Sequence, residues 1–160
     1  MVGDSNVLRL LSVPEWPKFS VSGAKAENFA LQSKFRESLL YKPDIVFLLL
    51  GGNDISRTCT PLSIANNIRK IQDKYYQNGA SRIYVFEIMP RTKPKGLHPD
   101  QFSRTKSGVN LRLRRKIRKD LICLGGRAVF DTFLAEDGVH LNSEGQQQLM
   151  SSIADRVIPS

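Results

Sequence analysis

Short hydrophobic runs alternate along the chain with stretches in which apolar residues recur every three or four positions. The clearest run, Ile45-Val46-Phe47-Leu48-Leu49-Leu50, lies within residues 44–50 and has no polar interruption. Such continuous apolar character is typical of a strand that is buried on both faces of a parallel sheet. Four further runs predict strands in the same way, at residues 1–3, 18–21, 82–88 and 127–131.

Helical patterns fill the gaps between these runs. The best defined covers residues 61–77, where Thr60 is the expected cap, Pro61 occupies the first turn and Asn78-Gly79 ends the helix. Further helices are predicted at residues 6–12, 27–41, 109–124 and 143–157. Residues 90–107 are rich in proline and glycine, so we expect a long loop there.

Strands separated by helices of this length indicate βαβ crossovers. We therefore predict an α/β fold: a three-layer α/β/α sandwich around a parallel sheet of about five strands, in a flavodoxin-like order. The 160 residues fit a single domain spanning 1–160. Neither a membrane span nor a secretory signal is visible, and two cysteines make no disulfide framework or zinc-site pattern, so an intracellular, cytoplasmic location is expected.

The net charge of +9 is concentrated in one segment. Residues 91–119 contain eleven Lys or Arg residues and a single acid, whereas the rest of the chain is nearly neutral. The candidates for contact with a polyanion are Arg112, Arg114, Arg115, Lys116, Arg118 and Lys119. These side chains form a face of a helix that is simply exposed to water, or they bind RNA, DNA or an anionic membrane. Phe102 is the only aromatic residue in the segment, so binding to nucleic acid would be indifferent to base sequence.

Residues suited to acyl transfer follow four of the five predicted strands. Ser5 follows the first strand, Gly23 the second and Asn53 the third, while Asp137 and His140 follow the fifth. The carboxyl ends of parallel strands lie at one edge of the sheet, where ligands bind in such folds. We therefore expect these five residues to lie close together.

The chemistry of acyl transfer suggests a role for each of them. A serine hydroxyl needs an adjacent base, and the chain offers only His98 and His140. Asp137 lies three residues before His140 and can orient its imidazole, whereas His98 lies in the basic loop and is expected to have no such role.

An oxyanion also needs hydrogen-bond donors. The candidates are the backbone N–H groups of Ser5 and Gly23 and the side-chain amide of Asn53. Two acids are expected to be structural: Asp4 should hydrogen-bond around the Ser5 turn, and Asp54 should cap or orient its own loop.

Four blocks of the sequence resemble the signature blocks of the SGNH (GDSL-type) hydrolases, in the family's order: Gly3-Asp4-Ser5, Gly23, Gly51-Gly52-Asn53-Asp54 and Asp137-Gly138-Val139-His140-Leu141. The resemblance implies that Ser5 is the nucleophile, His140 the base and Asp137 the third member of a triad. It implies that Gly23 and Asn53 are oxyanion donors, that the substrate is a short acyl (acetyl-type) or lipid ester, and that no metal or organic cofactor is used.

The compact, basic character also resembles the esterase domain in the first open-reading-frame protein of some LINE-type (non-LTR) retrotransposons. Only two residues precede Gly3-Asp4-Ser5, so either the first strand is short or the chain was cut from a longer parent. The alternative to a serine esterase is a nucleic-acid- or membrane-binding module that uses residues 91–119. The sequence does not define an oligomeric state.

Overall fold

A computed structural model describes residues 1–10, 16–123 and 131–157 of the chain. Its centre is one five-stranded parallel sheet with the order β2-β1-β3-β4-β5. The strands are β1 (Val2–Gly3), β2 (Phe19–Ser20), β3 (Ile45–Leu49), β4 (Arg82–Phe86) and β5 (Leu121–Ile122). This flavodoxin-like order confirms the predicted fold class.

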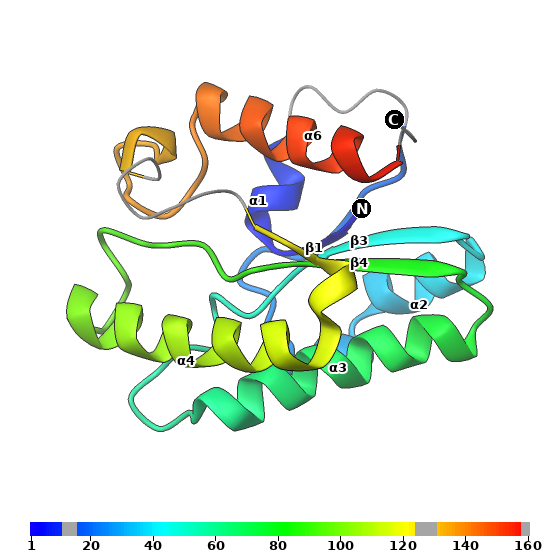
Figure 1. Cartoon of the computed structure of the whole chain (residues 1–160), viewed down its shortest axis with the longest axis horizontal. Coiled ribbons are helices and arrows are strands. Elements are labelled where there is room, and N and C mark those ends of the chain that lie inside the picture. Colours follow the sequence, from blue (N-terminus) through cyan, green and yellow to red (C-terminus); the bar gives the residue numbers. More distant parts are fainter. Residues whose placement is uncertain (11–15, 124–130, 158–160) are drawn as a thin grey trace.

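Helices cover both faces of the sheet and complete the three layers (Figure 1). On one face lie α1 (Ser5–Leu8) and α6 (Ser143–Val157). On the other lie α2 (Ser33–Leu40), α3 (Pro61–Gln77) and α4 (Pro99–Ile117). Across the described ranges, no helix has the length and apolar character needed to cross a bilayer.

The core consists of two hydrophobic clusters, one on each side of β3. Val46 and Leu48 belong to the cluster that includes Ile68 of α3, whereas Phe47 and Leu49 belong to the cluster on the α6 side. Side chains alternate between the faces of a strand, so an uninterrupted apolar run is buried on both sides. The prediction for this strand is confirmed.

Helix α3 begins and ends at the predicted residues. The Thr60 hydroxyl accepts the N–H of Ser63 at 3.1 Å, and Gly79 beyond the C-terminus has φ +97°. The capping signals in this stretch all agree, which is why its bounds could be predicted.

The helix predicted at 27–41 is interrupted. A 3-10 turn, η1 (Phe29–Leu31), precedes α2, and Gln32 between them has extended backbone with ψ 144°. Just upstream, the Asp54 carboxylate accepts the N–H groups of Ala26 and Glu27 at 2.8 and 3.1 Å. This long-range contact holds the start of the segment to the loop after β3, and a local helical pattern gives no sign of it.

Two predictions near α4 were wrong. The helix begins at Pro99, inside the stretch 90–107 predicted as loop, with His98 as its cap. Gly108 looked like a loop signal, but a Cβ there would lie 3.0 Å from Pro61 Cγ, so the glycine allows α3 and α4 to approach closely. The helix also ends early: η2 (Arg118–Asp120) follows it, and then β5 begins at Leu121.

The fifth strand was therefore misplaced. Leu121, which lies inside the helix predicted at residues 109–124, pairs instead with Val85 in the sheet. Most of the predicted strand 127–131 lies outside the described residues, and Asp131 opens a 3-10 turn, η3 (Asp131–Phe133).

Candidate active site

Ser5 is the first residue of α1 and directly follows the turn after β1. The turn is held from both sides: the N–H of Asp4 donates to the Leu49 carbonyl at 3.2 Å, and the Asp4 carboxylate accepts the N–H of Asn6 at 2.9 Å. Asp4 caps α1 as expected and is buried. Although β1 has only two residues, both neighbouring strands flank it, which fixes the position of Ser5.

A continuous chain of hydrogen bonds runs from Ser5 through His140 to Asp137. Ser5 Oγ and His140 Nε2 lie 2.8 Å apart, and His140 Nδ1 and Asp137 Oδ2 lie 2.6 Å apart. The other carboxylate oxygen of Asp137 accepts the N–H groups of Val139 and His140, both at 2.9 Å. Hydrogen bonds from the backbone and the ring of His140 hold the pKa of Asp137 well below its usual value. Asp137 therefore remains ionised and can stabilise an imidazolium.

Asn6 is a positioning residue that sequence reasoning missed. Its side-chain oxygen accepts the backbone N–H of Leu141 at 3.1 Å, across 135 residues of sequence. This buried bond ties the His140 loop to the helix that carries Ser5. The only sign of this role in the sequence is that Asn6 directly follows Ser5. No motif in the sequence links Asn6 to Leu141.

Gly23 lies at the end of β2, in a turn next to β1. The Val21 N–H donates to the Gly3 carbonyl at 3.1 Å, which holds this turn beside the Ser5 turn. Gly23 has φ +70°, and no heavy atom lies within 4 Å of the position of a Cβ. Its backbone N–H donates to no described residue. The space beside this N–H is open to a ligand, as an oxyanion donor requires.

The Asn53 side chain reaches the same turn from the loop after β3. Its Nδ2 donates to the Ala24 carbonyl at 3.1 Å, and its Oδ1 accepts from Arg91 at 3.0 Å. Asp54 beside it is buried, and burial raises the pKa of its carboxyl group. Its bonds to the backbone at residues 26 and 27 give it the structural role expected of it.

The other candidates lie elsewhere. His98 is exposed, and its Nδ1 accepts the N–H of Asp100 at 3.3 Å. The polyanion candidates lie toward the end of α4 and in η2, next to the start of β5, whereas Ser5 follows the end of β1. In the sheet, β3 and β4 lie between β5 and β1, which separates these residues from Ser5. One of them, Arg114, forms an ion pair with Glu87. Within the described ranges, no His, Cys, Asp and Glu cluster could hold a metal ion.

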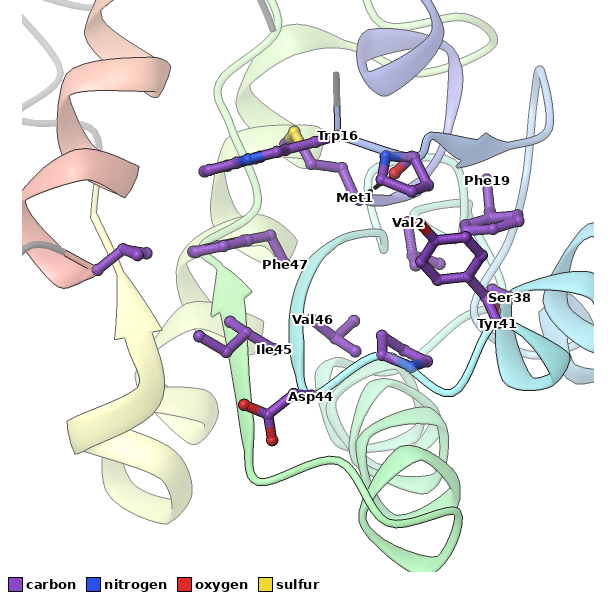
Figure 2. Close-up of a pocket in the computed structure, with 13 residues that line it drawn as sticks. Met1, Val2, Trp16, Phe19, Ser38, Tyr41, Asp44, Ile45, Val46 and Phe47 are labelled. Carbon is purple, nitrogen blue, oxygen red and sulfur yellow. Dashed lines mark hydrogen bonds between the residues drawn. The ribbon is translucent and has the colours of Figure 1, made fainter. Parts of the chain in front are cut away.

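An apolar cavity of about 310 Å³ also lies away from Ser5 (Figure 2). It is at the amino-terminal ends of β1 and β3, between Met1, Tyr41 and Phe47. The ring of Trp16 stacks on that of Phe47 with a centroid separation of 5.7 Å. Its lining includes neither Ser5 nor His140.

Comparison with known proteins supports the fold and shows the family. A model of the GDSL-like lipase/acylhydrolase family matches residues 7–148. A carbohydrate esterase family 3 protein from Talaromyces cellulolyticus superimposes with TM-score 0.71 and 21% identity, over 88% of this chain and 69% of that one. A GDSL-like lipase from Bacteroides thetaiotaomicron VPI-5482 gives TM-score 0.75 and 15% identity, over 96% and 84%.

A third structure, an acetyl esterase mutant with an acetate ion, gives TM-score 0.67 and 20% identity, over 88% of this chain and 69% of that one. Comparison with curated protein sequences finds no match. The protein is thus an α/β ester hydrolase by class. The chain belongs to the GDSL-like lipase/acylhydrolase family.

Proposed function

We propose that the protein is a serine esterase in which Ser5 attacks the ester carbonyl. The observation that carries this proposal is the unbroken chain of hydrogen bonds from Ser5 Oγ through His140 to Asp137. His140 accepts the Ser5 proton as the Oγ–carbon bond forms, then donates it to the departing alcohol. A water molecule, deprotonated by His140, attacks the acyl-enzyme and releases the carboxylic acid.

The negative charge of the tetrahedral intermediate is met by three donors in this proposal. The backbone N–H groups of Ser5 and Gly23 supply two, and the Asn53 amide supplies the third. The hydrogen bond from Asn53 Nδ2 to Ala24 supports this arrangement, because it holds the amide beside the Gly23 turn. An NH₂ group has two hydrogens, so the second stays available to the oxyanion.

We propose short acyl groups of the acetyl type as the first substrates to test, ahead of lipid esters. The apolar cavity in Figure 2 lies at the amino-terminal ends of β1 and β3, whereas Ser5 follows the carboxyl end of β1. The cavity therefore offers no place for a long acyl chain attached at Ser5. The similar structures described as an acetyl esterase and a carbohydrate esterase point the same way.

A fluorophosphonate probe should label Ser5 covalently, because it reacts with serines activated by a neighbouring base. The measurement is peptide mass spectrometry after labelling, alongside hydrolysis of p-nitrophenyl esters of two to twelve carbons. We expect a single adduct at Ser5 and the highest kcat/KM for the shortest esters. Label on another serine, with Ser5 unmodified, would refute this mechanism.

We propose a second function for the end of α4: sequence-indifferent contact with nucleic acid. The exposed side chains of Arg115, Arg118 and Lys119 form no ion pair with any described residue, which favours this function. Because β3 and β4 lie between β5, which follows this basic group, and β1, which precedes Ser5, both functions fit on one domain. The resemblance to the esterase domain of LINE-type retrotransposon proteins is consistent with an RNA partner.

Replacing Arg115, Arg118 and Lys119 together by glutamine should weaken binding to single-stranded RNA at least about tenfold at low salt and flatten its salt dependence. Filter binding across a salt series measures both quantities. A matched variant with glutamine at Lys34, Arg36 and Lys42, which are exposed on or just after α2, removes the same charge elsewhere. Equal weakening in both variants, or no RNA binding by the parent, would exclude a specific site; binding to anionic vesicles alone would indicate a membrane partner.

A further inference from the structure

We infer that Arg91 is a positioning residue for the oxyanion site: its guanidinium holds the Asn53 side-chain amide with Nδ2 turned toward the Gly23 turn. The inference rests on the proposed function, because it gives Arg91 a role only through Asn53. In the sequence, Arg91 is one of the eleven basic residues of the segment 91–119, with no sign of a separate role. Unlike a solvated charge, its side chain is half-buried.

The direction of one hydrogen bond carries the inference. Arg91 Nη2 donates to Asn53 Oδ1 at 3.0 Å. A guanidinium has only donors, so its partner must be the carbonyl oxygen of the amide. The –NH₂ group then faces the other way, where Nδ2 donates to the Ala24 carbonyl at 3.1 Å. A flipped amide would present an acceptor oxygen to the oxyanion and repel it.

The surroundings of Arg91 are shaped to hold the guanidinium in this place. A Cβ on Gly52 would lie 2.7 Å from Arg91 Nη2, so the absence of a side chain at Gly52 makes room for it. The Phe102 ring lies on another side, with its centroid 5.4 Å from Arg91 Cζ. Arg91, Gly52 and Asp4 line one small pocket of about 10 Å³. Burial lowers the pKa of the Arg91 guanidinium, and the charge of the nearby Asp4 carboxylate opposes that shift.

The backbone next to Arg91 also contacts the loop that carries Asp137. The Thr92 N–H donates to the Gly138 carbonyl at 2.9 Å, and Lys93 Nζ donates to the Glu136 carbonyl at 2.8 Å. The segment after β4 therefore contacts the His140 loop through the Thr92 backbone and the Lys93 side chain, and it contacts the Asn53 loop through the Arg91 side chain. This geometry lets Arg91 fix Asn53 relative to Ser5 and His140.

A double-mutant cycle between Arg91→Met and Asn53→Ala tests the inference. Asn53→Ala should lower kcat for p-nitrophenyl acetate by about 10²- to 10³-fold. Arg91→Met should lower kcat by about 10- to 100-fold, with KM changed less than about threefold, because ground-state binding is retained. In the Asn53→Ala background, Arg91→Met should cause no further loss. Arg36→Met, the same substitution at an exposed position of α2, should leave kcat unchanged.

A second pair of variants guards against simple misfolding. Arg91→Met leaves the buried Asp4 carboxylate without its counter-charge, so the comparison is repeated between Asp4→Asn and Asp4→Asn/Arg91→Met. Relative to Asp4→Asn alone, the double variant should lose a further factor of about 10 to 100 in kcat. The melting temperatures of these two variants should be the same. Independent, multiplicative losses at Arg91 and Asn53 would overturn the inference while leaving the esterase proposal intact. Full activity of Asn53→Ala, or of Ser5→Ala, would instead remove the proposed function on which the inference rests.

Discussion

Alanine at Ser5 or at His140 is expected to lower kcat for p-nitrophenyl acetate by roughly 10⁴- to 10⁶-fold. In the proposed mechanism, Ser5→Ala removes the atom that forms the acyl-enzyme, and His140→Ala leaves the Ser5 hydroxyl protonated at the moment of attack. Their 2.8 Å contact makes the two groups one functional unit. The double variant should therefore be little slower than either single variant, which steady-state kinetics of all three proteins would measure.

Matched substitutions separate this loss from general damage. Ser151→Ala changes an exposed serine on α6, and His98→Ala changes the exposed histidine that caps α4; both should keep the parent rate. The parent rate itself should fall as the solution is acidified, since only a neutral imidazole can accept the Ser5 proton. Single variants whose losses multiply, or a rate that ignores acidification, would contradict a Ser5–His140 unit.

The sequence was most informative where local chemistry and tertiary structure agree. The apolar run in β3 and the capping signals around α3 each specify their element without help from distant residues. The five candidates for acyl transfer could be proposed together because parallel strands bring their carboxyl ends to one edge. The structure places the side chains of Ser5, His140 and Asp137 in hydrogen-bond contact and brings Asn53 to the Gly23 turn.

Three further long-range contacts could not be predicted, because no motif in the sequence marks them. Asn6 meets Leu141, Asp54 meets the backbone near residue 26, and Arg91 meets Asn53, in each case through a contact that only the folded chain creates. The start of α4 was missed for a related reason. Gly108 reads locally as a helix breaker, but it lies within α4, where the missing side chain lets α3 approach closely.

Gly3 lies in the strand that precedes Ser5, and Gly3→Ala should lower the free energy of unfolding by about 3 kcal/mol. A Cβ at Gly3 would lie 2.2 Å from the Leu49 carbonyl oxygen and 2.9 Å from Val7 Cγ2. The methyl group must therefore push β1 away from β3, and it also disturbs the bond from the Asp4 N–H to that carbonyl. Urea unfolding measures the loss, and the folded fraction should hydrolyse esters more slowly because the Ser5 turn has moved.

Gly96→Ala is the matched control, because the two glycines are needed for different reasons. Gly96 has φ +72° and nothing within 4 Å of a Cβ, so alanine there should cost only about 1 kcal/mol of backbone strain and leave kcat unchanged. The steric clash at Gly3 should therefore lower both stability and kcat. The backbone strain at Gly96 should lower stability alone. If the two variants lost equal stability and kept equal kcat, β1 would tolerate a side chain at Gly3, and the close contact between β1 and Leu49 could not be what positions Ser5.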